Sequence, residues 1–127
     1  MNNWHAFLQL QAPSFLDGHS ISFDEASFDY AADPEEYSYF SPLVHLGAIL
    51  VEGGDAKKFL QGQVTCDLNE LSQDNSICGA RCNPKGRALV NFQLHEIDDQ
   101  KLLMVLHHSL VISVKDELSK YAAFFKV

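Results

Sequence analysis

Three apolar segments in the second half of the chain follow one another with almost no connecting sequence, and this spacing constrains the fold most. The segments span residues 77–82, 87–96 and 101–107, with turns at 83–86 and at Asp98-Asp99. Each has the length of a strand and is bounded by turn residues. Parallel strands need a crossover of about a dozen residues or more, so these strands must be antiparallel neighbours.

The middle segment alternates between apolar and polar residues. Side chains of a strand point to opposite faces in turn. One face of this segment is therefore predicted to join the core, and the other to carry polar groups. The core set is Ala88, Val90, Phe92 and Leu94, and the polar set is Arg87, Asn91, Gln93 and His95.

A strand and a short helix are predicted ahead of these segments. The compact apolar run Val44–Val51 ends at Gly53-Gly54. Asp55 has the chemistry of a helix N-cap, since its carboxylate can accept from free amides of the first turn. A helix is expected over 56–61, with Gly62 as a left-handed stop. A second helical turn is expected over 67–71.

A final helix is predicted after the last strand, with Ser109 as its cap. Apolar residues recur there at helical spacing: Leu110, Val114, Leu118, Tyr121 and Phe125. The order is thus one strand or two, a helix, three strands and a helix. We expect an α+β fold, an antiparallel sheet with helices on one face.

The chain divides into two parts of different composition. Residues 1–41 are acidic and rich in aromatics, and residues 42–127 carry the periodic segments. A short strand is predicted at 21–23, and a turn or helix start at 33–36. With 127 residues and 46% apolar content, the whole chain has the size of one domain and enough apolar residues for a core.

The charge distribution disfavours direct nucleic-acid binding. The net charge is −8, and no Lys or Arg occurs before Lys57, whereas residues 1–56 carry nine acids. The remainder has eight acids and nine bases, a balance of +1. Such a chain offers no broad attraction to a phosphate backbone.

A cytoplasmic protein with reduced thiols is expected. No apolar run reaches the roughly 18 residues of a membrane span, and the N-terminus lacks the pattern of a signal peptide. Cys66, Cys78 and Cys82 form no disulfide framework and no metal-ligand spacing. The rings of His107 and His108 are expected on opposite faces of a strand, so no metal site is predicted.

The stretch Asn83-Pro84-Lys85-Gly86-Arg87 reads as a turn. Pro84 suits the second position of a β-turn that starts at Asn83, and Gly86 supplies conformational freedom at its end. In a phosphate-binding loop of the Walker type a glycine precedes the lysine and a helix follows; here the lysine precedes the glycine and a strand follows. On local grounds, Lys85 and Arg87 are solvated cations.

Two motifs, however, resemble the YgfZ family. They are Phe59-Leu60-Gln61-Gly62-Gln63-Val64-Thr65-Cys66-Asp67-Leu68 and the downstream Asn83-Pro84-Lys85-Gly86-Arg87, in one register over roughly residues 43–127. The family comprises folate-binding relatives of the glycine cleavage T-protein (GcvT, aminomethyltransferase). The resemblance implies that residues 42–127 form one β-β-α-β-β-β-α half of a two-half folate-binding domain. It also implies that the rest of the protein, including the other half, is missing from this chain.

The resemblance implies a tetrahydrofolate ligand and a role in iron–sulfur cluster assembly or repair, and thereby in tRNA modification. Iron–sulfur proteins would be indirect partners. The motif positions on the expected ligand side are Thr65, Asp67, Lys85, Arg87 and Asn91. Hydrogen-bonding groups suit a pterin edge, and cations suit a glutamate tail. For Thr65 and Asp67, helix capping and turn formation are equally expected.

Two other functions stay open from the sequence. An aminomethyltransferase is one, although the relatives carry an aspartate pair where this chain has Val90-Asn91, so no catalytic residue is predicted. A stand-alone interaction protein, with residues 1–41 as the partner surface, is the other. A half-domain also exposes apolar surface and a sheet edge, so self-association is expected.

Overall fold

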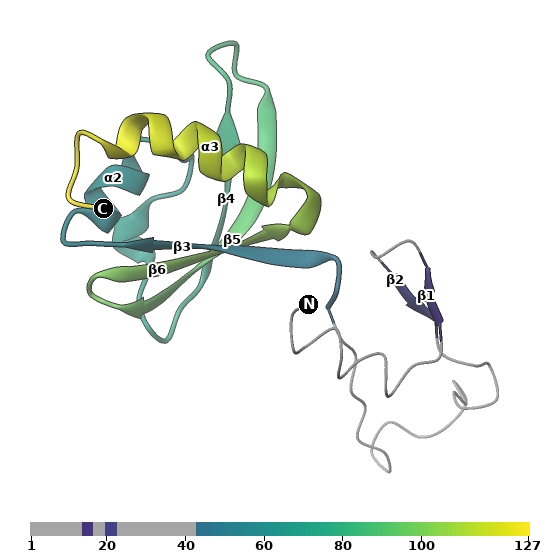
Figure 1. Cartoon of the computed structure of the whole chain (residues 1–127). Coiled ribbons are helices and arrows are strands. Elements are labelled where there is room, and N and C mark those ends of the chain that lie inside the picture. Colours follow the sequence, from purple (N-terminus) through teal and green to yellow (C-terminus); the bar gives the residue numbers. More distant parts are fainter. Residues whose placement is uncertain (1–13, 17–19, 23–42) are drawn as a thin grey trace. The chain divides into compact units, whose positions relative to one another are not determined.

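The computed structural model describes residues 14–16, 20–22 and 43–127, which fall into two compact units, 1–45 and 46–127. In the first unit, β1 (Ser14–Leu16) pairs antiparallel with β2 (Ser20–Ser22) (Figure 1). The strand predicted at 21–23 thus overlaps β2. The turn or helix start predicted at 33–36, like most of segment 1–41, lies outside the described residues.

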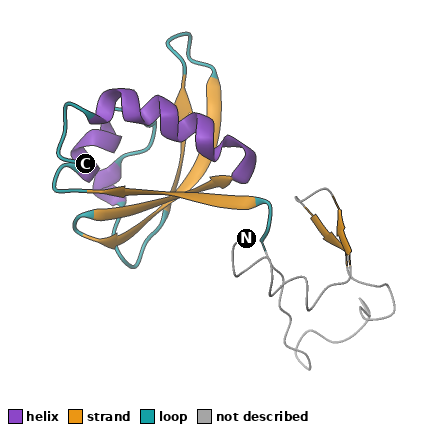
Figure 2. Ribbon diagram, viewed as in Figure 1, coloured by secondary structure: helices purple, strands orange, loops and turns teal. Residues whose placement is uncertain are grey.

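A four-stranded antiparallel sheet forms the second unit (Figure 2). Its strands are β3 (Leu46–Glu52), β4 (Ile77–Cys82), β5 (Ala88–Asp98) and β6 (Lys101–His107). Their order in the sheet is β3-β6-β5-β4. The three consecutive strands pair as neighbours, which confirms the antiparallel arrangement predicted from the short turns. β3 then adds to β6, far along the chain.

Helical elements cover one face of this sheet (Figures 1 and 2). They are α2 (Ala56–Gln61), the short 3-10 turns η2 (Leu68–Glu70) and η3 (His108–Leu110), and α3 (Val111–Ala122). Alternate residues of β3, β5 and β6 meet the helices and form the core. The predicted α+β fold is confirmed, with one strand before α2 among residues 43–127.

Burial along β5 follows the predicted alternation. Val90, Phe92 and Leu94 are buried, and they pack in one cluster with Leu60 of α2 and Leu118 of α3. Ala88, expected in the same apolar row, is exposed because a bulge opposite Cys82 shifts the register near that end of the strand. The apolar stripe therefore begins one residue pair later than predicted.

Asp55 stands at the predicted position before α2, but its side chain caps nothing in that helix. Instead, the Lys126 amide donates to Asp55 Oδ2 over 3.1 Å, and the Asp55 amide donates to the Lys126 carbonyl over 3.4 Å. Gly53, at φ 146°, leaves room for this segment: a Cβ there would lie 2.0 Å from the Lys126 oxygen. The capping prediction is wrong, because the carboxylate holds the chain that follows α3.

Two further helix-end predictions are wrong. Gly62 adopts φ −80°, ψ −6°, a right-handed conformation, because its amide continues the turn by donating to the Phe59 carbonyl over 3.3 Å. Ser109 does not cap the last helix. The chain enters α3 through η3, and there His107 is the capping residue, its Nδ1 accepting from the Ser109 amide over 3.4 Å.

Candidate functional site

The turn between β4 and β5 has the geometry predicted from its residues. The Gly86 amide donates to the Asn83 carbonyl over 2.9 Å, and Gly86 has φ 78°. Asn83 Oδ1 accepts from the backbone amides of Lys85 and Arg87, each over 3.0 Å. The side chain of Asn83 therefore holds both cationic residues in place through their backbones.

Lys85 and Arg87 are exposed at the end of this hairpin, which extends past the other strands (Figure 1). Among the ion pairs of the described residues, none involves either cation. Arg81, lower on the same hairpin, is different: it is buried and lies 3.7 Å from Glu117 of α3. Two cations at the tip thus remain available to a ligand.

Thr65 lies against the outer edge of β4. Its amide donates to the Ala80 carbonyl over 2.9 Å, and its hydroxyl accepts from the Ala80 amide over 3.0 Å. Ala80 is in turn the direct cross-strand partner of Asn91. The fold therefore brings Thr65 and Asn91 to the two sides of the same β4 residue.

Asp67 has a local structural role. Its carboxylate accepts from the Asn69 amide over 2.9 Å and so caps η2, as the capping alternative predicts. Gln61 holds the other side of this loop, donating to the Cys66 carbonyl over 3.2 Å and accepting from the Leu68 amide over 2.8 Å. These two hydrogen bonds of Gln61 were not predicted from the sequence, because neither Cys66 nor Leu68 lies at helical spacing from Gln61.

Asn91 projects from the sheet face opposite to the helices. The cross-strand register places apolar side chains of β3 and β6 on that face, including Leu50, Leu103 and Val105. Leu50 is 51% exposed. Among residues 43–127, no helix covers this face, which we call the open face. Gln93, on the same face, donates to Ser76 over 2.8 Å, whereas the Asn91 side chain makes no hydrogen bond within the described residues.

The five predicted site residues therefore fall into three places. Thr65 and Asn91 flank β4 near the middle of the hairpin, Lys85 and Arg87 stand at its tip, and Asp67 caps η2. Four of the five belong to the hairpin or to its edge. Asp67 is tied to the loop and is the weakest candidate for ligand contact.

The cysteines and histidines form no metal-binding cluster of three or more groups within the described residues. Burial is the main cause that raises the pKa of the Cys66 thiol above its ordinary value. The two histidine rings do not point apart as expected: the centroids of His107 and His108 are 4.9 Å apart. The strand ends at His107, and the turn of η3 brings the second ring to the same side.

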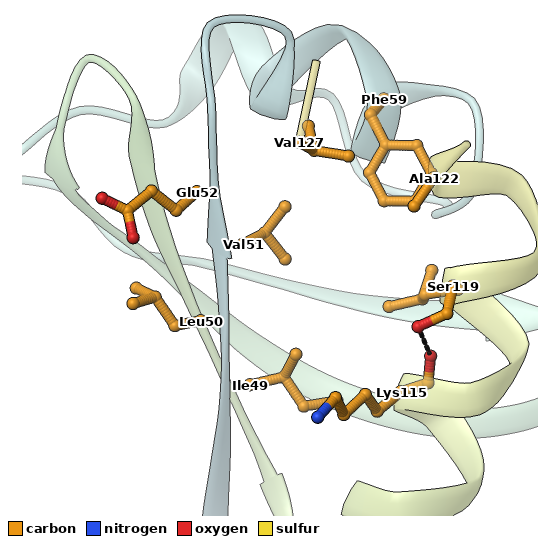
Figure 3. Close-up of a pocket in the computed structure, with 10 residues that line it drawn as sticks. Ile49, Leu50, Val51, Glu52, Phe59, Lys115, Ser119, Ala122 and Val127 are labelled. Carbon is orange, nitrogen blue, oxygen red and sulfur yellow. Dashed lines mark hydrogen bonds between the residues drawn. The ribbon is translucent and has the colours of Figure 1, made fainter. Parts of the chain in front are cut away.

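A cavity of about 300 Å³ lies between β3 and α3, on the helix-covered side of the sheet (Figure 3). Ile49 and Val51 point into it, and Leu50 and Glu52 point away. Phe59 and Val127 close one end. None of the five predicted site residues lines this cavity, so it is separate from the motif-bearing hairpin.

The arrangement of sheet and helices defines a structural class. It resembles the crystal structure of glycine cleavage system aminomethyltransferase T from Bartonella henselae, with a TM-score of 0.60 and 24% identity. The match covers 65% of this chain and 23% of that chain. The fold is thus the aminomethyltransferase kind. No protein-family model matches the chain.

Curated relatives identify the family within that class. The tRNA-modifying protein YgfZ of Colwellia psychrerythraea is 39% identical over 90 residues, which are 71% of this chain and 28% of the relative. The YgfZ protein of Yersinia pestis is 35% identical over 103 residues, 77% of this chain and 31% of the relative. An uncharacterized Haemophilus influenzae protein is 34% identical over 90 residues. The chain belongs to the YgfZ family, and the matched region spans less than a third of each relative.

Proposed function

We propose that this chain forms part of a folate-binding, YgfZ-type protein of the cytoplasm that serves iron–sulfur cluster assembly or repair and, through it, tRNA modification. The observation that carries the proposal is the amide of Asn91. It has no hydrogen-bond partner among the described residues and projects from an open face that also carries the apolar side chains of Leu50, Leu103 and Val105. A flat pterin needs such a combination: apolar contact on its ring face and a few placed hydrogen bonds on its edge.

The open face alone is not enough to form a complete ligand site, so further protein is needed to cover the ligand. A small-molecule site buries most of its ligand, and a single exposed sheet face cannot do so. We infer that the remaining part of a YgfZ protein covers this face and completes the site. The match to less than a third of each relative is consistent with that inference.

Calorimetric titration with tetrahydrofolate tests the folate proposal. The 127-residue chain would be compared with a chimera in which it replaces the matched region of the Colwellia protein. We expect the chimera to bind and the chain alone to bind at least about tenfold more weakly, since it buries less of the ligand. Equal tight binding by both, or no binding by the chimera, would contradict the proposal.

Within the chimera, Asn91→Ala tests the residue itself. Loss of one hydrogen bond that the pterin edge needs is expected to weaken binding about fivefold to tenfold. Gln73→Ala, a change at an exposed amide in the loop before β4, is the matched control and should leave the affinity unchanged.

Aminomethyl transfer has less support from this face. The polar side chains that β5 presents there near Asn91 are amides and an imidazole, and the adjacent Val90 is buried on the helix side. Among the described residues, Glu52 of β3 places a carboxylate on this face (Figure 3), but Glu52 Oε1 is paired with Lys101 Nζ over 3.6 Å. Within those residues, no helix is long and apolar enough to cross a membrane.

A further inference from the structure

The two edges of the four-stranded sheet differ. At the β4 edge, Thr65 occupies the backbone groups of Ala80 through its own amide and hydroxyl. At the β3 edge, no backbone hydrogen bond from residues 43–127 reaches the outer side of the strand. An unpaired edge strand is a template for one more strand, so β3 is the edge at which this sheet can be extended.

The register of β3 shows which of its backbone groups point outward. The Gly53 amide donates to the Gln100 carbonyl over 2.8 Å, and the pairing with β6 continues without a shift along β3. Hydrogen-bonded pairs alternate in an antiparallel ladder, so the backbone of Ile49 bonds to β6. The N–H and C=O groups of Ala48 and Leu50 therefore point away from the sheet and are open to a further strand.

The cavity beside α3 lies at this same edge. Its volume is about 300 Å³, and among the described strands only β3 lines it. Ile49 and Val51 point into it from the sheet side (Figure 3). Leu118 and Ala122 line it from α3. This volume is at the small end of the range for ligand cavities, about 300–1,000 Å³, and suits a single apolar side chain. A strand added to β3 would place every second side chain on the helix-covered side, beside this cavity.

A cation stands at the same cavity. Lys115 lines it from α3, and Figure 3 shows the Lys115 side chain extending towards Ile49. None of the ion pairs among the described residues involves Lys115. On an added strand, a carboxylate two residues from the apolar side chain would lie on the same side and face this amine, because side chains alternate.

We propose that the β3 edge and the adjoining cavity bind an extended peptide as a fifth, antiparallel strand, with an apolar side chain in the cavity and an acidic side chain, two residues further on, paired with Lys115. In this mode of recognition, main-chain bonds supply affinity and side-chain pockets supply specificity. A second copy of the chain fits less well, because β3 presents Gly47, Ile49 and Val51 on the helix-covered side and so offers Lys115 no acid. The site is independent of the folate proposal, since Asn91 lies on the opposite face.

Nuclear magnetic resonance titration of the 127-residue chain with the blocked peptide acetyl-Ser-Thr-Leu-Thr-Glu-Thr-Ser-amide tests the proposal. We expect saturable shifts of the amides of residues 46–52 and of the methyl groups in the cavity. Alanine in place of the peptide leucine should weaken binding at least about tenfold, through lost apolar contact, and glutamine in place of the peptide glutamate about threefold. Equal affinity of the three peptides, or no shift in β3, would overturn the proposal.

Methylation of single peptide nitrogens tests the added strand itself. In the antiparallel arrangement the central threonine lies opposite Leu50, and its amide donates to the Leu50 carbonyl. An N-methyl group on this threonine should weaken binding at least about tenfold, because it removes that donor and obstructs the edge. The amide of the peptide glutamate points away from β3, so an N-methyl group there should leave the affinity within about twofold. Equal effects of the two methyl groups would rule out the added strand.

Variants of the chain locate the two side-chain contacts. Lys115→Gln should weaken binding of the glutamate peptide about threefold and leave the glutamine peptide unaffected. Ala122→Leu fills the cavity and should weaken binding of the leucine peptide at least about tenfold. Lys58→Gln removes an exposed cation from α2 and, as the matched control, should change neither affinity. If residues 46–52 shift with protein concentration but not with peptide, a second copy occupies the edge and the proposal is wrong.

Discussion

Gly79 of β4 occupies a place where no side chain fits. A Cβ at this position would lie 2.5 Å from Cys66 Sγ and 2.9 Å from Phe92 Cε2. In the loop that carries the first family motif, the Cys66 thiol therefore packs directly against Gly79 of β4. This contact ties the motif loop to the sheet beside Thr65.

Gly79→Ala is expected to lower the free energy of unfolding by about 1–3 kcal/mol, as overpacking does. Cys66→Ala in the same chain removes the nearest clashing atom. The double variant should therefore be more stable than the sum of the two single changes predicts, by at least about 0.5 kcal/mol. Urea denaturation measures both. Strict additivity would contradict the contact.

Gly54→Ala is the control for that cycle, because a Cβ there meets nothing within 4 Å. Its effect should stay within about 0.5 kcal/mol. Both glycines belong to the same sheet-and-helix unit. Comparing Gly54→Ala with Gly79→Ala therefore separates the steric clash from the general effect that replacing a glycine has on the conformational entropy of the backbone.

The Cys66 thiol should be alkylated more slowly than the exposed Cys78 thiol. Burial raises the pKa of the Cys66 thiol above its ordinary value in the folded chain. The folded state thus holds the Cys66 proton longer than the unfolded state, and the stability this gives is present below the unfolded pKa of the thiol and is lost as pH rises past its folded pKa. At pH 8, iodoacetamide should modify Cys78 several-fold faster than Cys66. Peptide mass spectrometry after timed labelling measures the two rates, and equal rates would contradict the assignment.

At the scale of elements, the segment after α3 is held by the loop before α2. Asp55 exchanges two hydrogen bonds with Lys126 and caps no helix. Asp55→Ala should therefore increase amide hydrogen exchange at Lys126 about fivefold or more, corresponding to the loss of about 1 kcal/mol. Exchange in α2 should be unaffected. Faster exchange in α2 with no change at Lys126 would restore the capping role.

The elements that sequence reasoning located well are those set by local chemistry. The bounds of α2, β4 and β6 are as predicted, because apolar periodicity and turn residues act within a few positions. The turn at Asn83–Gly86 was predictable for the same reason. In the site, the positions at the hairpin tip follow from that turn.

What could not be predicted depends on contacts between distant residues. Asp55 finds its partner 71 residues away, and an N-cap pattern gives no sign of it. The His107 and His108 rings meet because a 3-10 turn replaces the expected strand-to-helix junction at Ser109. The alternation of apolar and polar residues predicted the face on which Asn91 lies. It did not predict that the Asn91 side chain makes no hydrogen bond within the described residues, because that depends on which groups the neighbouring side chains of β5 bind.

At the scale of the whole second unit, one sheet face is left uncovered by the described residues. The exposed apolar residues there include Leu50, with Leu103 and Val105 beside it on β6. Surfaces of this kind favour association in water. The sheet edge at β3 is a second region through which copies can pair.

We therefore expect the isolated chain to self-associate, and Leu50→Asp to shift it towards the monomer. Sedimentation velocity over a range of concentrations measures this. Ile112→Asp, at a residue 74% exposed on α3, is the matched control and should not change the distribution. Purely monomeric sedimentation of the unmodified chain at high concentration would contradict the expectation.

The pairing of β3 with β6 has a consequence for synthesis. β3 is made first among the four strands, yet in the sheet it neighbours β6 alone, and β6 ends at His107. In a nascent chain, β3 therefore has no sheet neighbour while α2, β4 and β5 leave the ribosome. The β4–β5 hairpin can form during that interval, because its partners are consecutive. The cavity between β3 and α3 is thus formed last. A pause in translation before residue 107 would leave β3 unpaired and accessible to chaperones.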